Sequence, residues 1–517
     1  GGAFSLADVS WLAIFERLQR DDGVRAVVID ASRLRAGWAT LQTLRRAVAG
    51  LRESGKKVIL FLEDGDNALA YLAGAADRVI MPPSGTLQLT GLRAEVLFLQ
   101  GILEKARVQP EFVRLGDYKS AVEPFTRKSL SPPARDALES ILDDLYDQLV
   151  SGIAEGRGLS SKQIRALIDA GPYRAGEAKA AGLIDETLYE DELEDYLAAQ
   201  LDRPAEKIGV VEADVYSRFA RPPALPPGAR VPFPRIALIL AEGLIRTGRA
   251  RPSQVGRSVG ATTFCDALRH AREDDRISAI VVRVDSPGGS GLASDLIWRE
   301  VKKAREKKPV VVSMGDVAAS GGYYLAMPAD WILAEPGTIT GSIGVIAGKF
   351  SLRGLYDALG LVKETIDRGE RAGAHSDYRP FTKEEKKKLQ AEVEACYDDF
   401  VTKAADGRGM AIDAMQEVAQ GRVWTGKQAL SHRLVDELGG ITEAISAAKS
   451  RAEIPTAQPV SVEVLPRHMP AFLSASLLNP LRAIPSSMRG ALETAGSASE
   501  FREGEPLALW PFTLKIF

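Results

Sequence analysis

Two residues of this chain, Ser320 and Lys119, have the chemistry of a nucleophile and its base. A serine hydroxyl attacks a carbonyl once a neighbouring base takes its proton, and a neutral lysine amine is able to act as that base. Ser320 lies within Ala318-Ala-Ser-Gly-Gly322, and Lys119 within Gly116-Asp-Tyr-Lys-Ser120. Taken singly, such a serine is more often a helix N-cap, and such a lysine is more often a solvated surface residue. The two become a candidate pair because of where each is missing elsewhere in the chain.

The chain contains two copies of one pattern. Asp21-Asp-Gly-Val-Arg-Ala-Val-Val-Ile29 recurs as Asp274-Asp-Arg-Ile-Ser-Ala-Ile-Val-Val282, at an offset of 253 residues (274 minus 21). The same offset relates Gly116 to Gly369. Internal repeats decide how every later pattern is interpreted, because each copy is expected to form one structural unit. We therefore predict a tandem repeat.

The copies differ where chemistry is expected. The first copy has Asn67 in the position of Ser320, and the second copy has Ala372 in the position of Lys119. Each copy thus keeps one half of a candidate serine–lysine pair. If the two residues meet in the folded chain, they form a nucleophile and a general base.

A glycine turn and a second serine complete the candidate site. Asp285-Ser-Pro-Gly-Gly289 follows a strand-like run, and its glycines permit a tight turn whose N–H groups face a ligand oxygen, although an ordinary turn is the alternative. The first copy has Ser32-Arg-Leu-Arg-Ala36 there, without glycine. Ser342, within Thr340-Gly-Ser-Ile-Gly344, is either a ligand of the lysine amine or a turn serine.

Alternating strand-like and helix-like segments would position these residues. In both copies a short β-branched run is followed by a helical stretch and a second run, namely Ala26–Ile29, 41–54 and 57–61 in the first, and Ile280–Val284, 293–307 and 309–312 in the second. This alternation predicts an α/β fold with largely parallel strands. Ser320 is expected where a strand ends and a helix begins, with its hydroxyl exposed.

The repeat also sets the predicted domain boundaries. We assign 1–217 to the N-terminal repeat, 218–234 to a proline-rich linker, 235–455 to the C-terminal repeat and 456–517 to a tail. The first copy begins at a helix near Leu12 and lacks the first strand of the second copy, so we expect an upstream strand, and an anchor before it, to be missing. Apolar clusters in the tail, Ala471–Leu473 and 507–512, are expected to pack on the body in preference to a membrane surface.

Composition excludes several functions. The chain has 517 residues, 45% of them apolar and 26% charged, which is ordinary for a globular protein. A formal net charge of −3 argues against nucleic-acid binding. Its 2 cysteines and 4 histidines lack metal-ligand spacing, so we predict no metal site and no cofactor.

Four motifs together resemble signal peptide peptidase A, also called protease IV, in its long two-repeat form. They are 116–125, Asp285–Gly289, 313–323 and Thr340–Gly344. The resemblance implies an α/β fold made of a tandem repeat of two crotonase/Clp-protease-like βαβ domains. It also implies Ser320 as nucleophile, Lys119 as general base and Ser342 as a contact of the lysine. The region of the oxyanion hole would comprise Gly288, Gly289 and Gly321.

The same resemblance implies a serine endopeptidase that cleaves apolar peptides, such as residual signal peptides, without a cofactor. It implies a homo-oligomer associated with a membrane and facing outside the cytoplasm. Two alternatives remain at this stage. A crotonase-like acyl-CoA enzyme would need neither Ser320 nor Lys119, and a non-catalytic membrane scaffold would survive the loss of either residue.

Overall fold

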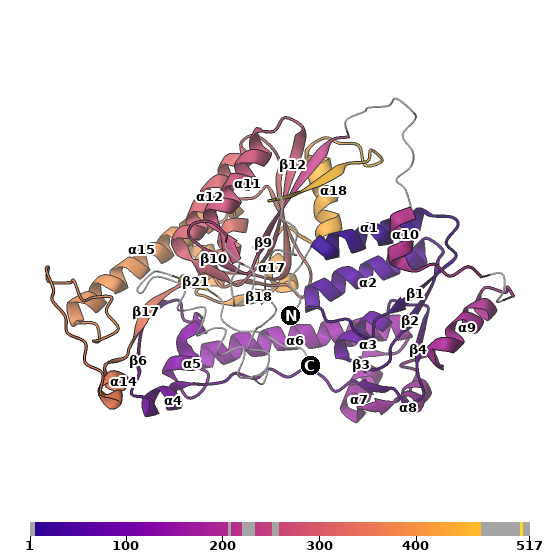
Figure 1. Cartoon of the computed structure of the whole chain (residues 1–517), viewed down its shortest axis with the longest axis horizontal. Helices are drawn as coiled ribbons and strands as arrows, with labels where there is room; N and C mark the ends of the chain where they lie inside the picture. Colours follow the sequence, from indigo (N-terminus) through magenta and orange to yellow (C-terminus); the bar gives the residue numbers. More distant parts are fainter. Residues whose placement is uncertain (1–5, 205–207, 220–232, 251–257, 467–506, 510–517) are drawn as a thin grey trace. The chain divides into compact units, whose positions relative to one another are not determined.

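The computed structural model describes residues 6–204, 208–219, 233–250, 258–466 and 507–509 (Figure 1). Among these residues the chain forms two compact units: unit 1 comprises 6–94, 142–204 and 208–219, and unit 2 comprises 95–141, 233–250, 258–466 and 507–509. Most of the expected proline-rich linker and the cluster Ala471–Leu473 lie outside the described residues.

Unit 1 is built on a parallel sheet with the strand order β1-β2-β4-β8. These strands are Ala26–Asp30, Lys57–Phe61, Arg78–Met81 and Glu186–Thr187. A second, three-stranded sheet comprises β3 (Gly65–Asp66), β5 (Thr86–Gln88) and β7 (Tyr173–Arg174). The helices are α1 (Leu6–Arg20), α2 (Trp38–Glu53), α3 (Asn67–Ala73), α7 (Ser161–Ala170), α8 (Ala175–Ala180), α9 (Leu193–Gln200) and α10 (Ala213–Phe219), with η2 (Glu190–Glu192) before α9. Helix α6 (Pro132–Arg157) is divided between the two units.

Unit 2 contains two larger sheets. The eight-stranded sheet has the order β18-β16-β14-β12-β9-β20, with β15 and β19 branching from β14. Its strands are Val423–Thr425, Ile339–Gly341, Val310–Ala319, Ile277–Ser286, Arg235–Glu242, Ser461–Leu465, Trp331–Ala334 and Glu437–Leu438. The six-stranded sheet has the order β11-β10-β13-β21-β17-β6. Its strands are Ser258–Gly260, Leu244–Arg246, Gly288–Ser290, Leu507–Leu509, Val345–Ser351 and Gln109–Leu115.

The helices of unit 2 surround these sheets. They are α4 (Gln100–Lys105), α5 (Glu123–Thr126), α11 (Ala261–Glu273), α12 (Gly291–Arg305), α13 (Gly321–Ala326), α14 (Arg353–Leu359), α15 (Lys383–Arg408), α16 (Ile412–Val418), α17 (Gly426–Ser431) and α18 (Ile441–Arg451), with η1 (Ser120–Val122) before α5. The inner strands β9, β12 and β14 are almost fully buried because apolar helix faces cover them.

The repeat is visible in the topology. The parallel series β1-β2-β4-β8 of the first copy corresponds to β12-β14-β15-β19 of the second. In both copies an aspartate accepts from an N–H at the start of the second strand and pairs with an arginine of the preceding helix, Asp77 with Arg52 and Asp330 with Arg305. The α/β class expected from the sequence is confirmed.

The compact units nevertheless cut across the two sequence copies. Strand β6 belongs to the first copy, but it pairs antiparallel with β17 of the second, from Val345 opposite Leu115 to Ser351 opposite Gln109. Figure 1 shows the purple β6 beside the orange β17. This ladder, which joins distant parts of the sequence, carries 95–141, with Lys119, into unit 2. The predicted boundaries 1–217 and 235–455 were drawn from the sequence copies, and the compact units divide the chain at other residues.

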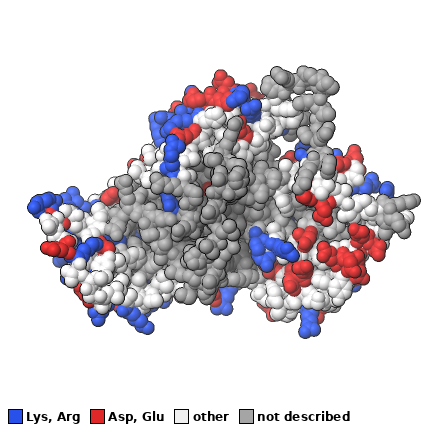
Figure 2. Space-filling model, in the orientation of Figure 1, with Lys and Arg blue, Asp and Glu red and all other residues white. Residues whose placement is uncertain are grey.

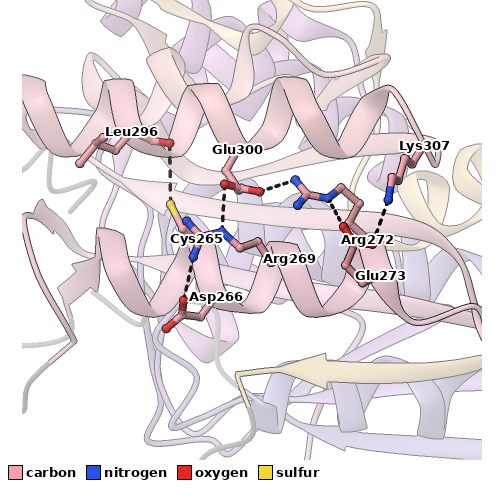
Figure 3. A network of polar contacts seen from close by, with 8 residues as sticks. All are labelled: Cys265, Asp266, Arg269, Arg272, Glu273, Leu296, Glu300 and Lys307. Atoms are coloured by element: carbon pink, nitrogen blue, oxygen red, sulfur yellow. Dashed lines mark hydrogen bonds and ion pairs between the residues drawn. The ribbon is translucent and has the colours of Figure 1, made fainter.

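A polar network holds α12 against α11, and α12 follows β13 directly (Figure 3). The buried carboxylate of Glu300 on α12 pairs with Arg269 and Arg272 of α11, and Lys307 pairs with Glu273. Cys265 lies in the same interface, where burial raises the pKa of its thiol to about 11. The network fixes the helix that starts at the glycine turn.

Over the part of the chain that the structure describes, no helix has both the length and the apolar character needed to cross a membrane. Within the same residues no group of three or more histidine, cysteine or acidic side chains is arranged to hold a metal ion. Figure 2 shows basic and acidic side chains next to one another on the visible described surface.

Candidate active site

Ser320 lies between the end of β14 and the start of α13, as the sequence predicted. Its backbone has φ 56° and ψ −114°, a conformation that L-residues rarely adopt and that is common at functional sites. The backbone is held by a 2.8 Å bond from Ser320 N to Gly341 O. Ser320 is the N-cap residue of α13, but its side chain makes no helix-capping bond, so its hydroxyl is not used to cap the helix. The expected exposure of the hydroxyl is wrong as well, because Ser320 is 0% exposed.

Lys119 brings its amine to this serine. Its Nζ lies 2.7 Å from Ser320 Oγ, 3.0 Å from Ser342 Oγ and 3.0 Å from the Ser342 carbonyl oxygen. A neutral amine has two N–H donors and one lone pair. In the neutral form, Nζ can donate its two N–H groups to the two Ser342 oxygens, and its lone pair can accept the hydrogen of the Ser320 hydroxyl. Three oxygens around Nζ match the three donors of an ammonium as well as a neutral amine, so burial decides the protonation state.

Burial favours the neutral form of Lys119. Lys119 is 1% exposed, and burial lowers its pKa well below the ordinary lysine value. Desolvation is the only cause of this shift, since removing an ammonium from water disfavours the charged form. A lysine of this kind can receive a proton at neutral pH.

The loop that carries Lys119 is tied down by a buried carboxylate. Glu123, 1% exposed, accepts from Arg114 Nη1 at 2.9 Å and from Ser131 N at 2.9 Å. Arg114 Nη1 also donates to the Lys119 carbonyl oxygen at 3.2 Å. The charges of Arg114 and Glu123 compensate each other, and the bond from Arg114 to the Lys119 carbonyl oxygen holds the backbone of the lysine loop.

A segment that the sequence did not single out, Gln420–Arg422, joins the lysine loop to the Ser342 turn. Tyr118 N donates to Gln420 O at 2.9 Å, and Ser342 N donates to Arg422 O at 2.7 Å. Between them, Gly421 N donates to the Ile343 carbonyl oxygen at 2.7 Å. In the sequence this segment is marked only by a glycine shortly before a strand, a pattern too common to indicate a functional residue.

Gly421 also approaches the lysine closely. A Cβ built on Gly421 would lie 2.6 Å from Lys119 Cβ and 2.6 Å from Lys119 N, and the glycine has φ +77°. Only glycine leaves room for Lys119 here. We name Gln420–Arg422 the bridge segment.

The three glycines that are candidates for the oxyanion hole are all buried. Gly288 and Gly289 are the first two residues of β13, and Gly321 follows Ser320. Gly288 N donates to Ser286 Oγ at 3.1 Å. Gly289 has φ +154°, and a Cβ there would lie 2.1 Å from Ile245 O, which explains why a glycine stands at this position.

In the first copy, the position that corresponds to Ser320 is occupied by a buried asparagine; we call this position the closed counterpart of the site. Asn67 is 0% exposed and stands where the repeat places a serine in the second copy. Its side-chain oxygen accepts from Thr90 N and Gly91 N, both at 3.1 Å, and its amide donates to Gly91 O at 2.9 Å. The Asn67 side chain thus supplies hydrogen-bond partners to the backbone of residues 90 and 91, which is a structural role.

Comparison with known proteins identifies the family. Residues 50–202 and 302–455, one segment in each copy, match Peptidase family S49. The chain is 37% identical over 481 residues to the chloroplastic serine protease SPPA of Arabidopsis thaliana, covering 92% of this chain and 69% of that protein. It is 32% identical over 449 residues to Protease 4 of Salmonella typhi, covering 85% and 71%.

Solved structures are more distant. A mutant of the 1510-N membrane-bound stomatin-specific protease is 16% identical with a TM-score of 0.28, covering 45% of this chain and 98% of that chain. A mutant of ClpP1 from Listeria monocytogenes is 14% identical with a TM-score of 0.27, covering 40% and 94%.

The family model and the sequence relatives define a serine peptidase. The chain belongs to peptidase family S49, with relatives of the signal peptide peptidase A, or protease 4, type. The resemblance expected from the four motifs is confirmed. The comparisons lend no support to an acyl-CoA enzyme or a scaffold.

The close approach at Gly421 predicts a specific loss of activity. Gly421→Ala should displace Lys119 and lower kcat by about 100-fold, since a shift near 1 Å in a reacting group has effects of this size. Gly360→Ala is the matched control, because Gly360 has φ +70° and nothing within 4 Å of its built Cβ. Thermal unfolding and steady-state kinetics should show a stability cost in both variants and a kcat loss in Gly421→Ala alone. Equal kcat values in the two variants would contradict the assigned role of Gly421.

Burial of Lys119 predicts a pH-dependent stability difference. The unfolded chain titrates Lys119 near the ordinary value of 10.5, and the folded chain titrates it lower. Between the two pKa values the unfolded chain binds more protons, so wild-type stability rises with pH in that interval. The unfolding free energy of Lys119→Met minus that of wild type should therefore be largest below the depressed pKa and should fall as pH approaches 10.5. Urea unfolding across this range measures it, and a constant difference would exclude a depressed pKa.

Proposed function

We propose that this serine peptidase works through a Ser320–Lys119 dyad. The observation that carries the proposal is the 2.7 Å contact between Lys119 Nζ and Ser320 Oγ in a buried site where the lysine pKa is depressed. The Ser320 hydroxyl gives its proton to Nζ as its oxygen attacks the peptide carbonyl. Nζ then passes that proton to the leaving amine, and an acyl-enzyme on Ser320 Oγ remains.

Deacylation reverses these roles. Lys119, neutral again, takes a proton from a water that attacks the acyl carbon, and Ser320 recovers its proton as the ester bond breaks. Ser342 holds Nζ in line through its hydroxyl and carbonyl oxygens, both 3.0 Å away. The negative charge on the substrate oxygen is assigned to N–H groups among Gly288, Gly289 and Gly321. Gly288 would exchange its bond to Ser286 Oγ for the oxyanion.

The substrate proposed is an extended apolar peptide, with residual signal peptides as the biological class. Support comes from the relatives, one of which carries the printed name putative signal peptide peptidase SppA, from Enterococcus faecium, 34% identical over 192 residues. Small or apolar residues flank the dyad, among them Ala121, Val122 and Ile346. Membrane association, a position outside the cytoplasm and a homo-oligomeric assembly are parts of the same proposal.

The dyad predicts that neither partner is dispensable. Ser320→Ala and Lys119→Ala should each lower kcat for an apolar peptide ester by about three orders of magnitude or more, because the members of such a unit act together. Asn67→Ala is the matched control, since it removes the equivalent position of the first copy and should leave kcat unchanged while lowering stability. The measurement is kcat for ester hydrolysis by each variant, after its folding has been verified. Full activity in either dyad variant would overturn the mechanism.

The depressed lysine pKa also predicts the pH profile. Because only neutral Lys119 accepts the serine proton, kcat/KM should rise as pH passes the depressed pKa and reach its plateau well below 10.5. Measurement of kcat/KM between pH 5 and pH 10 tests this. An acid limb centred near the ordinary lysine pKa would mean that Lys119 is solvated in the working enzyme.

A further inference from the structure

Strand β14, which ends directly before the candidate nucleophile, contains a bulge. Its register against β12 places Met314 opposite Val284 and Ala318 opposite Ser286. Between these two pairs β14 has the three residues Gly315–Val317, whereas β12 has one residue. We name Gly315–Val317 the β14 bulge. A bulge bends its strand and re-aims the residues that follow, so this one contributes to the position of the serine.

The bulge is also where β14 changes its neighbour on the other side. Before the bulge, Val311–Ser313 pairs with β15, and from Val317 to Ala319 the strand pairs with β16. β16 ends at Gly341, whose carbonyl oxygen accepts from Ser320 N at 2.8 Å. The bulge thus brings the end of β14 beside the strand that holds the backbone of Ser320.

Two side chains hold the bulge, one from each flank. On the β12 side, Asp285 Oδ1 accepts from Val317 N at 3.0 Å. On the β16 side, Thr338 Oγ1 donates to Gly315 O at 2.8 Å. The irregular backbone of a bulge leaves the regular ladder of hydrogen bonds, and these side chains supply partners to its peptide groups.

A buried arginine holds the strand just before the bulge. Arg283 of β12 is 1% exposed, and its Nη1 donates to Met314 O at 2.7 Å and to Ser313 Oγ at 2.8 Å. Burial of a guanidinium has a large desolvation cost. Two of the hydrogen bonds that offset this cost go to the strand that carries the nucleophile.

The contact between Asp285 and the bulge is close. A Cβ built on Gly315 would lie 3.0 Å from Asp285 Cβ and 3.1 Å from its Cγ, so a larger residue there would push the bulge away from the carboxylate. Ser320 keeps its φ of 56° only while the surrounding contacts hold it. A loosened bulge would therefore displace the nucleophile.

The first copy lacks the side chains that hold the bulge. At the offset of 253 residues their counterparts differ in type, with Ser32 for Asp285, Asp30 for Arg283 and Gly85 for Thr338. The register of β1 against β2 is continuous, and β2 ends well before Asn67. Contacts that the fold requires occur in both copies, as the aspartate–arginine pairs do. The bulge and its side chains accompany the serine, which ties them to the chemistry.

We propose that Asp285 is a positioning residue, whose carboxylate fixes the register at which β14 delivers Ser320 Oγ to Lys119 Nζ. It acts through the backbone N–H of Val317 and takes no part in the proton transfer. Thr338 holds the same bulge from the opposite side. The inference rests on the proposed function, because Ser320 and Lys119 are taken as its dyad.

Asp285→Ala and Asp285→Asn test the role of the carboxylate oxygen. Alanine removes the acceptor of Val317 N, so kcat for an apolar peptide ester should fall about 100-fold with KM unchanged, since a displacement near 1 Å in a reacting group has effects of this size. Asparagine keeps an oxygen acceptor in the same place and should restore most of the wild-type kcat. Equal kcat losses in the two variants would overturn the acceptor role.

Asp330→Ala is the matched control. Asp330 also accepts from a backbone N–H of β14, Val310 N at 2.8 Å, but at the other end of the strand. This variant should lose thermal stability and keep kcat. A kcat loss as large as that of Asp285→Ala would make both aspartates general supports of the sheet and would overturn the proposal.

Thr338→Val tests the bulge independently of Asp285. It removes the hydrogen bond to Gly315 O and should lower kcat with KM unchanged, whereas Thr338→Ser keeps the hydroxyl and should restore kcat. An unchanged kcat in a folded Thr338→Val variant would contradict the control of Ser320 by the bulge.

Crystal structures of wild type and Asp285→Ala separate this inference from the mechanism. In the variant, Ser320 Oγ should lie beyond hydrogen-bond distance of Lys119 Nζ. Such a displacement, together with no ester hydrolysis by wild type, would sustain the positioning role and overturn the proposed function. An unmoved Ser320 with unchanged kcat, beside a wild type that hydrolyses the ester, would overturn the positioning role and leave the dyad in place.

Discussion

The burial of one lysine amine without a charged partner is the constraint on which the site depends. A solvated Lys119 would be protonated at neutral pH and unable to accept the proton of Ser320. Desolvation alone depresses its pKa, so every element that excludes water from Nζ contributes to the chemistry. The contacts with Ser320 and Ser342 then satisfy the amine without restoring its charge.

That burial requires several chain segments to converge. β6 places the lysine loop by pairing along β17, and the Arg114–Glu123 pair fixes the loop's backbone. The bridge segment joins this loop to the Ser342 turn, and the absence of a side chain at Gly421 allows the approach. The network shown in Figure 3 holds α12, which follows β13, against α11. The contacts of β6, the Arg114–Glu123 pair and the bridge segment position the chain segments that carry Lys119 and Ser342.

The repeat explains how such a site can arise from two similar halves. Both copies retain the same strand series and the same aspartate–arginine pairs, which are requirements of the fold. Only the second copy retains a serine at the strand end, and only the first retains the lysine. At the closed counterpart, Asn67 uses its amide to satisfy the backbone of 90–91, so that position stabilises the fold and performs no chemistry.

The fold class, the repeat and the identity of the candidate pair all follow from the amino-acid sequence alone. Strand and helix periodicities are local properties, and the complementary loss of Ser320 and Lys119 is visible in an alignment of the chain with itself. The depth of burial, the strained backbone of Ser320, the bridge segment and the position of β21 became visible only in the folded chain. These features depend on contacts between residues that are distant in sequence, and no local pattern records them. The hydroxyl of Ser320 was expected at the surface for that reason, and packing of the surrounding segments places it in the interior.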